Sequence, residues 1–135
     1  MTRPAERQAW QALRSLVLDD DRRQEVSEVL GMSFVRAKAL RLIAGGAVPM
    51  RDLVAALGTD AAYTTVVLDD LEKRGFVTRA PHPVDRRAKI VSVTAVGRRA
   101  ARKADSILGR PPASFSRLPD ADLADLERIL VLLAP

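Results

Sequence analysis

Residues 60–94 read DAAYTTVVLDDLEKRGFVTRAPHPVDRRAKIVSVT, and this segment carries the clearest structural pattern in the chain. Its first half predicts a helix from Asp60 to about Arg74, because apolar or small residues repeat there at three- and four-residue steps. Gly75 ends that helix. Residues 76–80 and 89–94 then alternate in polarity and predict two strands, and two prolines between them predict a loop over 81–87. The stripe expected to face the core consists of Thr64, Val67, Leu68 and Leu71.

A shorter helix precedes this one. Residues 50–57 predict a compact helix that Gly58 closes. Asp60 is the predicted N-cap of the next helix, because its carboxylate also complements the helix dipole. The two helices meet across a two-residue link, which is the helix-turn-helix arrangement. Residues 33–44 predict a further helix upstream, with Ser33 as its N-cap.

Helical periodicity continues at both ends of the chain. Residues 5–30 predict helix, and the run DDDRR at 19–23 is either an exposed turn of one helix or a break between two. Thr94 caps a helix predicted over 95–108, and a last helix is expected over about 119–133. The predicted fold class is therefore mainly α (α+β), a winged helix-turn-helix with additional helices at both ends.

The composition excludes several classes of site. With 135 residues, the chain is expected to form one domain. The absence of cysteine excludes disulfides and thiolate chemistry, and a single histidine cannot supply a zinc site of several imidazoles. Glycine-rich phosphate loops and paired carboxylates on a cleft helix are also absent, so we predict that the protein is not an enzyme and needs no cofactor. The apolar runs are too short for a membrane span, and the N-terminus lacks the apolar core of a secretory signal, so we expect a cytoplasmic protein.

The positive charge is concentrated in one segment. The formal net charge of the chain is +5. Residues 74–103 contain nine basic residues and one acidic residue, Asp85, whereas the rest of the chain is slightly acidic. Such a segment is either a solvated face or a binding surface for an anionic partner, and it is centred on the predicted hairpin.

Motifs in this region resemble those of the MarR family of winged-helix transcription regulators. The segment LEKRGFV at 71–77 is similar to the family's exit from its recognition helix, and Asp85-x-Arg87, followed by VSVT at 91–94 and Gly97-Arg98, is similar to its wing signature. The resemblance covers residues 33–103 in detail and implies that this is the DNA-binding region. It implies that residues 1–32 and 104–135 form a helical dimerisation region. It also implies a homodimer in a bacterial or archaeal cytosol that binds a pseudo-palindromic operator in double-stranded DNA, usually as a repressor released by a small aromatic or anionic ligand.

The outward face of the predicted recognition helix carries few hydrogen-bonding side chains. Ala62, Thr65 and Val66 are expected to face the major groove, and Tyr63 is placed to reach a phosphate. Many relatives carry arginine where Val66 and Asp70 stand, so strong hydrogen-bond readout of guanine or adenine is not expected. We therefore predict contacts to thymine methyl groups together with DNA shape read by the wing. The alternative is that Asp69 and Asp70 repel phosphate and keep the helix out of the groove.

The wing supplies the predicted cationic contacts. Arg86 and Arg87 lie at its tip and are expected in the minor groove, where arginine is favoured. Asp85 and Asp60 are expected to orient the wing, and the alternative role of Arg87 is an ion pair with one of them. Candidate phosphate contacts elsewhere are Lys89, Arg79 and Arg51, each of which could instead be a solvated charge.

The terminal helices present apolar residues that fit a dimer interface, although packing within one subunit would also bury them. A ligand cleft is expected where these helices meet the winged region, with Trp10 and Phe34 either lining it or lying in the core. A second function class remains open, a winged-helix adaptor for protein contacts with weakened or lost DNA binding. The predicted dimerisation residues are Trp10, Leu13, Leu16, Val17, Leu123, Leu126, Leu130 and Leu133.

Overall fold

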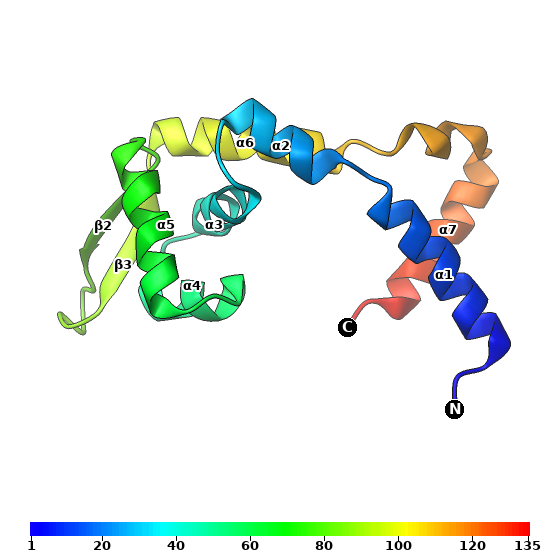
Figure 1. Cartoon of the computed structure of the whole chain (residues 1–135), viewed down its shortest axis with the longest axis horizontal. Coiled ribbons are helices and arrows are strands. Elements are labelled where there is room, and N and C mark those ends of the chain that lie inside the picture. The colour runs from blue at the N-terminus through cyan, green and yellow to red at the C-terminus, as the bar shows by residue number, and fades with distance from the viewer.

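A computed structural model describes all 135 residues and shows a mainly helical chain with one small sheet (Figure 1). The mainly α winged helix-turn-helix predicted from the sequence is confirmed. In chain order the elements are α1 (Pro4–Leu18), α2 (Arg22–Leu30), α3 (Phe34–Ala44), β1 (Val48–Pro49), α4 (Met50–Leu57), α5 (Ala61–Lys73), β2 (Val77–Pro81), β3 (Lys89–Val93), α6 (Ala95–Gly109), the 3-10 helix η1 (Ala113–Arg117) and α7 (Asp120–Leu133).

The sheet has three antiparallel strands in the order β1-β3-β2. Two residues form β1, too few for a periodic pattern, so the sequence did not predict this strand. Pro81 is also a strand residue, paired with Lys89, whereas the sequence predicted the start of the loop. His82 donates its N–H to Ala88, so Pro81 takes the intervening position, where an N–H would point away from β3. Because β2 is an edge strand, this proline interrupts no hydrogen bond.

The core lies around α3, which packs against α2, α4, α5, α6 and β3. The four stripe residues predicted for α5 are all fully buried, as are Leu40 and Ile43 of α3. Thr64 is a polar member of that stripe. Its hydroxyl lies 2.9 Å from the Asp60 carbonyl oxygen, to which it donates, and 2.7 Å from the Thr59 hydroxyl, so its burial leaves no unpaired polar atom.

The predicted helix caps are confirmed. Asp60 Oδ1 accepts the backbone N–H of Tyr63 at 2.7 Å, and the Ser33 and Thr94 hydroxyls accept N–H groups in the first turns of α3 and α6. Gly58 ends α4 with φ +65°, in the left-handed region that glycine adopts without strain.

The acidic run after the first helix is a break between two helices. Asp20 Oδ1 accepts the backbone N–H of Arg22 at 3.0 Å, and Asp20 Oδ2 lies 3.1 Å from Arg22 Nε. A side chain that takes a backbone N–H in this way competes with continuation of the helix. Residues 19–21 therefore separate α1 from α2, and α2 packs beside α6 (Figure 1).

The two ends of the chain extend away from the winged region. In Figure 1, α1 and α7 lie at the opposite end of α6 from the sheet, and neither helix contains a buried residue. The short helix η1, which lies between Pro112 and α7, was not predicted. None of the helices combines the length and apolar character needed to cross a membrane.

Candidate nucleic-acid interface

The outward face of α5 is exposed as predicted. Ala62, Thr65 and Val66 are all accessible, with Val66 52% exposed. Tyr63 is 39% exposed and flanks this face. The Thr65 hydroxyl donates to the Ala61 carbonyl within the helix at 3.0 Å, so its single donor is already used and only its oxygen can accept a further hydrogen bond. The face therefore offers mainly methyl groups to a partner.

The wing loop is organised by His82, for which the sequence predicted no role. His82 Nδ1 accepts the backbone N–H groups of Val84 and Asp85, each at 3.1 Å. Asp85 Oδ1 in turn accepts the backbone N–H of Arg87 at 3.1 Å. The predicted wing-orienting residue Asp85 thus bonds the backbone at the wing tip. The sequence feature that could have indicated this role is the position of His82, the single histidine, between two prolines of the loop.

Arg86 and Arg87 are exposed at the tip of the wing, and neither forms an ion pair. Asp60, predicted to orient the wing, caps α5 instead and has no ion pair with Arg87. Asp85 is engaged with backbone. Both arginine side chains are consequently available to an external anion.

Arg79 has a different environment from the tip arginines. It lies on β2 and its side chain is 25% exposed, because the guanidinium reaches back to α5. Its Nε donates to Glu72 Oε2 at 2.7 Å, and its Nη2 donates to Asp69 Oδ1 at 2.6 Å. The hydrogen bond to Glu72, followed by that to Asp69, raises the pKa of the Arg79 guanidinium. Arg79 is thus bound within the protein rather than solvated.

Asp70 is paired as well, on the neighbouring side of α5. Its Oδ2 accepts hydrogen bonds from Arg74 Nε at 2.8 Å and Arg36 Nε at 2.9 Å. The hydrogen bond from Arg74, the positive charge of Arg74 and the corresponding contact from Arg36 hold the pKa of this carboxyl below its ordinary value. Asp70 therefore ties α5 to α3, to which Arg36 belongs.

The other predicted phosphate contacts are solvent-facing. Lys89 is exposed at the start of β3 and forms no ion pair. Arg51 lies in the first turn of α4, with its side chain 81% exposed and Asp52 only at the 4.0 Å limit of an ion pair. Both side chains are accessible to a bound anion.

The predicted dimerisation residues form no core within one chain. Trp10 is 61% exposed, and Leu16, Val17, Leu130 and Leu133 are also exposed. Leu13, Leu123 and Leu126 are half-buried. Packing within the subunit, the alternative considered from the sequence, therefore leaves most of this apolar surface in contact with solvent.

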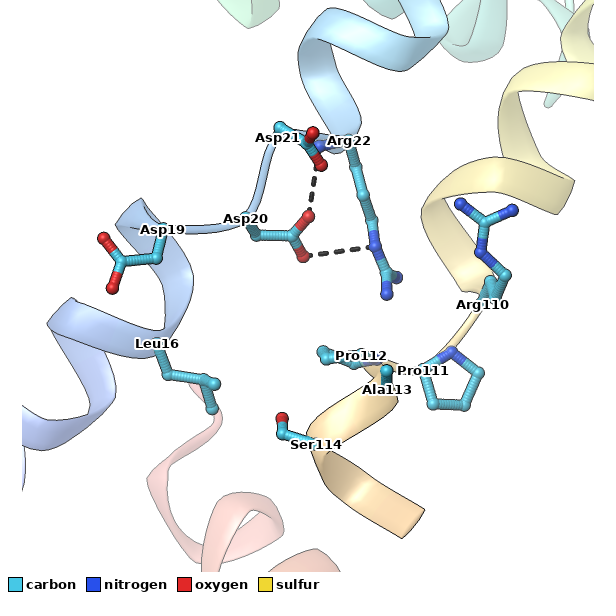
Figure 2. Close-up of a pocket in the computed structure, with 10 residues that line it drawn as sticks. All are labelled: Leu16, Asp19, Asp20, Asp21, Arg22, Arg110, Pro111, Pro112, Ala113 and Ser114. Atoms are coloured by element: carbon cyan, nitrogen blue, oxygen red, sulfur yellow. Dashed lines mark hydrogen bonds and ion pairs between the residues drawn. The ribbon is translucent and has the colours of Figure 1, made fainter.

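A hollow of about 600 Å³ lies where α1 and η1 meet the start of α2 and the end of α6, the location predicted for a ligand cleft (Figure 2). Its lining comprises Leu16, Asp19, Asp20, Asp21, Arg22, Arg110, Pro111, Pro112, Ala113 and Ser114. Arg22 is bonded to Asp20, and Arg110 is bonded to Glu25 at 2.6 Å. Trp10 and Phe34 do not line the hollow; Phe34 packs against the core, and the Arg23 guanidinium lies 5.2 Å from the centre of its ring.

The helix-turn-helix, the hairpin wing and the exposed tip arginines define a winged helix-turn-helix protein. Residues 30–88 match the model of the MarR family. Over this segment the chain is similar to the MarR family, which is a family of transcription regulators rather than enzymes. The resemblance stated from the sequence is confirmed.

Individual proteins are also similar to this chain in sequence or in fold. The chain is 37% identical over 92 residues to the uncharacterized HTH-type transcriptional regulator YfiV of Bacillus subtilis (strain 168). The matched region covers 66% of this chain and 57% of that relative. The wild-type apo form of MarR from E. coli has a similar structure, with a TM-score of 0.77, 23% identity and coverage of 100% of this chain and 99% of that chain. A mutant MarR from E. coli complexed with operator DNA gives a TM-score of 0.63 at 21% identity, covering 99% of this chain and 100% of that chain.

Proposed function

We propose that this protein is a dimeric transcription regulator that binds double-stranded DNA, with α5 in the major groove and the wing in the minor groove. The observation that carries the proposal is the pair of unpaired arginines at the tip of a wing beside an exposed recognition-helix face. The similar structure of a MarR mutant in complex with operator DNA supports it.

The wing and α5 are proposed to recognise different features of the DNA. Arg86 and Arg87 supply positive charge that is favoured in a narrow minor groove. Ala62, Val66 and the methyl group of Thr65 fit thymine methyl groups, since apolar contact is the way such a face reads the major groove. Lys89 and Arg51 are proposed to contact phosphates. Sequence selection would then combine thymine contacts with DNA shape.

We propose that a second copy of the chain covers the apolar residues of α1 and α7. This arrangement would remove side chains such as Trp10 and Leu133 from water and would present two wings to one duplex. A homodimer of this kind reads a pseudo-palindromic operator, because its two-fold axis coincides with that of the site.

The test is selection of DNA fragments by the purified full chain, followed by a salt titration. We expect enrichment of an inverted-repeat sequence and a steep fall of affinity with salt, because phosphate contacts release counterions. If no fragment is retained at any salt concentration, the protein is better described as a winged-helix adaptor for protein contacts.

We further propose that the protein represses transcription and that a small ligand releases it from DNA. The hollow at the base of α1 is the proposed effector site (Figure 2). Its two arginines are engaged by carboxylates, while Asp19 and Asp21 add negative charge, so the lining disfavours an anionic ligand. A thermal-shift screen of aromatic and anionic ligands, followed by measurement of operator release, tests this assignment.

A further inference from the structure

We infer that Arg79 is a positioning residue for DNA binding, which neutralises two carboxylates on the recognition helix and fixes the wing against it, without itself contacting phosphate. The inference rests on the proposed function, and it replaces the phosphate contact that the sequence suggested for Arg79.

The recognition helix carries negative charges that oppose its approach to DNA. Asp69, Asp70 and Glu72 all lie in the C-terminal half of α5. The partial negative charge at a helix C-terminus adds to the charge of these carboxylates. A helix that enters a groove between two phosphate backbones with three uncompensated carboxylates would be repelled, because like charges brought together cost binding free energy.

The Arg79 side chain compensates the negative charges of both Asp69 and Glu72. These two residues stand three positions apart, on neighbouring turns of α5, and the planar guanidinium of Arg79 reaches both. The N–O distances of 2.6 and 2.7 Å are those of strong charge-assisted hydrogen bonds.

Asp70 is compensated separately, by Arg36 and Arg74. The three carboxylates of α5 therefore face three guanidinium groups, and the cluster has no net charge. Two of these arginines come from other elements, α3 and β2, so the neutral cluster also joins the recognition helix to the core and to the wing.

A direct phosphate contact by Arg79 is opposed by the groups that surround its guanidinium. Nε and Nη2 are bonded to Glu72 and Asp69, and a phosphate that approached the remaining nitrogen, Nη1, would also approach these two carboxylates and be repelled by them. Arg86 and Arg87 have no such competing partners. The geometry therefore separates arginines that hold the interface from arginines that touch DNA.

The experiment removes the charges of Asp69 and Glu72 in a protein that already lacks the Arg79 guanidinium. We compare the wild type, R79A, and the triple variant R79A/D69N/E72Q, using a duplex selected from genomic fragments by the wild-type protein and checking each variant by thermal melting. R102A is the matched control, because Arg102 is exposed on α6, has no ion pair and carries the same charge. If R79A fails to fold, R79Q replaces it, since glutamine keeps most of the volume but not the charge.

We expect R79A to bind about tenfold more weakly and R102A to bind within about twofold of the wild type. The triple variant should recover to within about threefold of the wild type, with the wild-type dependence on salt. A triple variant that stays as weak as R79A, with a salt slope lower by about one, would show a direct phosphate contact and overturn the inference. Wild-type affinity in R79A would overturn it as well. Failure of the wild type to retain any duplex is a separate outcome, which refutes the proposed function.

Discussion

At the scale of single residues, Arg87 is the side chain whose removal should weaken DNA binding most directly. It lies at the wing tip without an ion pair, so truncation leaves no buried partner unpaired and should not affect folding. We expect R87A to weaken operator binding by about 1–3 kcal/mol. Fluorescence anisotropy measures this loss, with R102A as the charge-matched control. Unchanged affinity in a folded R87A protein would remove this residue from the interface.

Gly97 is the residue whose importance is purely steric. It lies in the first turn of α6, where a Cβ would overlap the carbonyl oxygen of Phe76. That carbonyl already accepts the N–H of Thr94 at 2.9 Å, and the Thr94 hydroxyl donates to the Gly75 carbonyl at 2.6 Å. The end of α5 and the start of α6 are thus held at backbone contact.

We therefore expect G97A to destabilise the protein by about 3 kcal/mol or more, since the neighbouring backbone must move to admit the methyl group. The control is G109A in the same helix, where the new Cβ meets nothing within 4 Å. That change should be neutral or slightly stabilising. Urea denaturation of both variants measures the difference, and equal stability for the two would contradict the steric explanation.

At the scale of elements, the tie between α5 and α3 should make stability depend on pH. The pKa of Asp70 is lowered in the folded protein, chiefly by its hydrogen bond with Arg74. A carboxyl with a lowered folded pKa stabilises the fold above its unfolded pKa, and this contribution is lost as pH falls through the folded pKa. Stability should therefore decline in the acidic range below the ordinary aspartate value of 3.8.

The substitution D70N removes that titration and leaves the shape of the side chain nearly unchanged. We expect D70N to be less stable than the wild type at neutral pH, and the gap between the two should narrow as the pH falls below about 4. Denaturation midpoints across this range provide the measurement. A gap that stays constant with pH would show that the Asp70 charge does not contribute to stability.

The elements also show which features are accessible from sequence. The buried stripe of α5 was predicted because burial on a helix follows its periodicity, and Asp60, Ser33 and Thr94 were predicted as caps because capping is a local interaction. The two-residue strand β1 is too short to carry a pattern. Arg79 was assigned to phosphate because its carboxylate partners lie seven and ten residues away on a different element, a distance that only the tertiary fold reveals.

At the scale of the whole molecule, the apolar surface of the terminal helices should determine both assembly and function. Leu130 and Leu133 of α7 are exposed in the single chain and belong to the proposed dimer interface. Burying a carboxylate in such an interface without a partner is strongly unfavourable. We therefore expect the double variant L130D/L133D to be monomeric, whereas D125A, which changes an exposed polar residue of the same helix, should remain a dimer.

The same variants test whether assembly sets DNA affinity. Two half-sites one helical turn apart, about 34–36 Å, can be bound together only if two winged regions are held at that spacing. The monomeric variant should therefore bind the full operator no better than a single half-site, while D125A should retain the wild-type preference for the full operator. Sedimentation equilibrium and anisotropy on both duplexes provide the two measurements. A monomer that still prefers the full operator would show that the winged regions, rather than α1 and α7, establish the spacing.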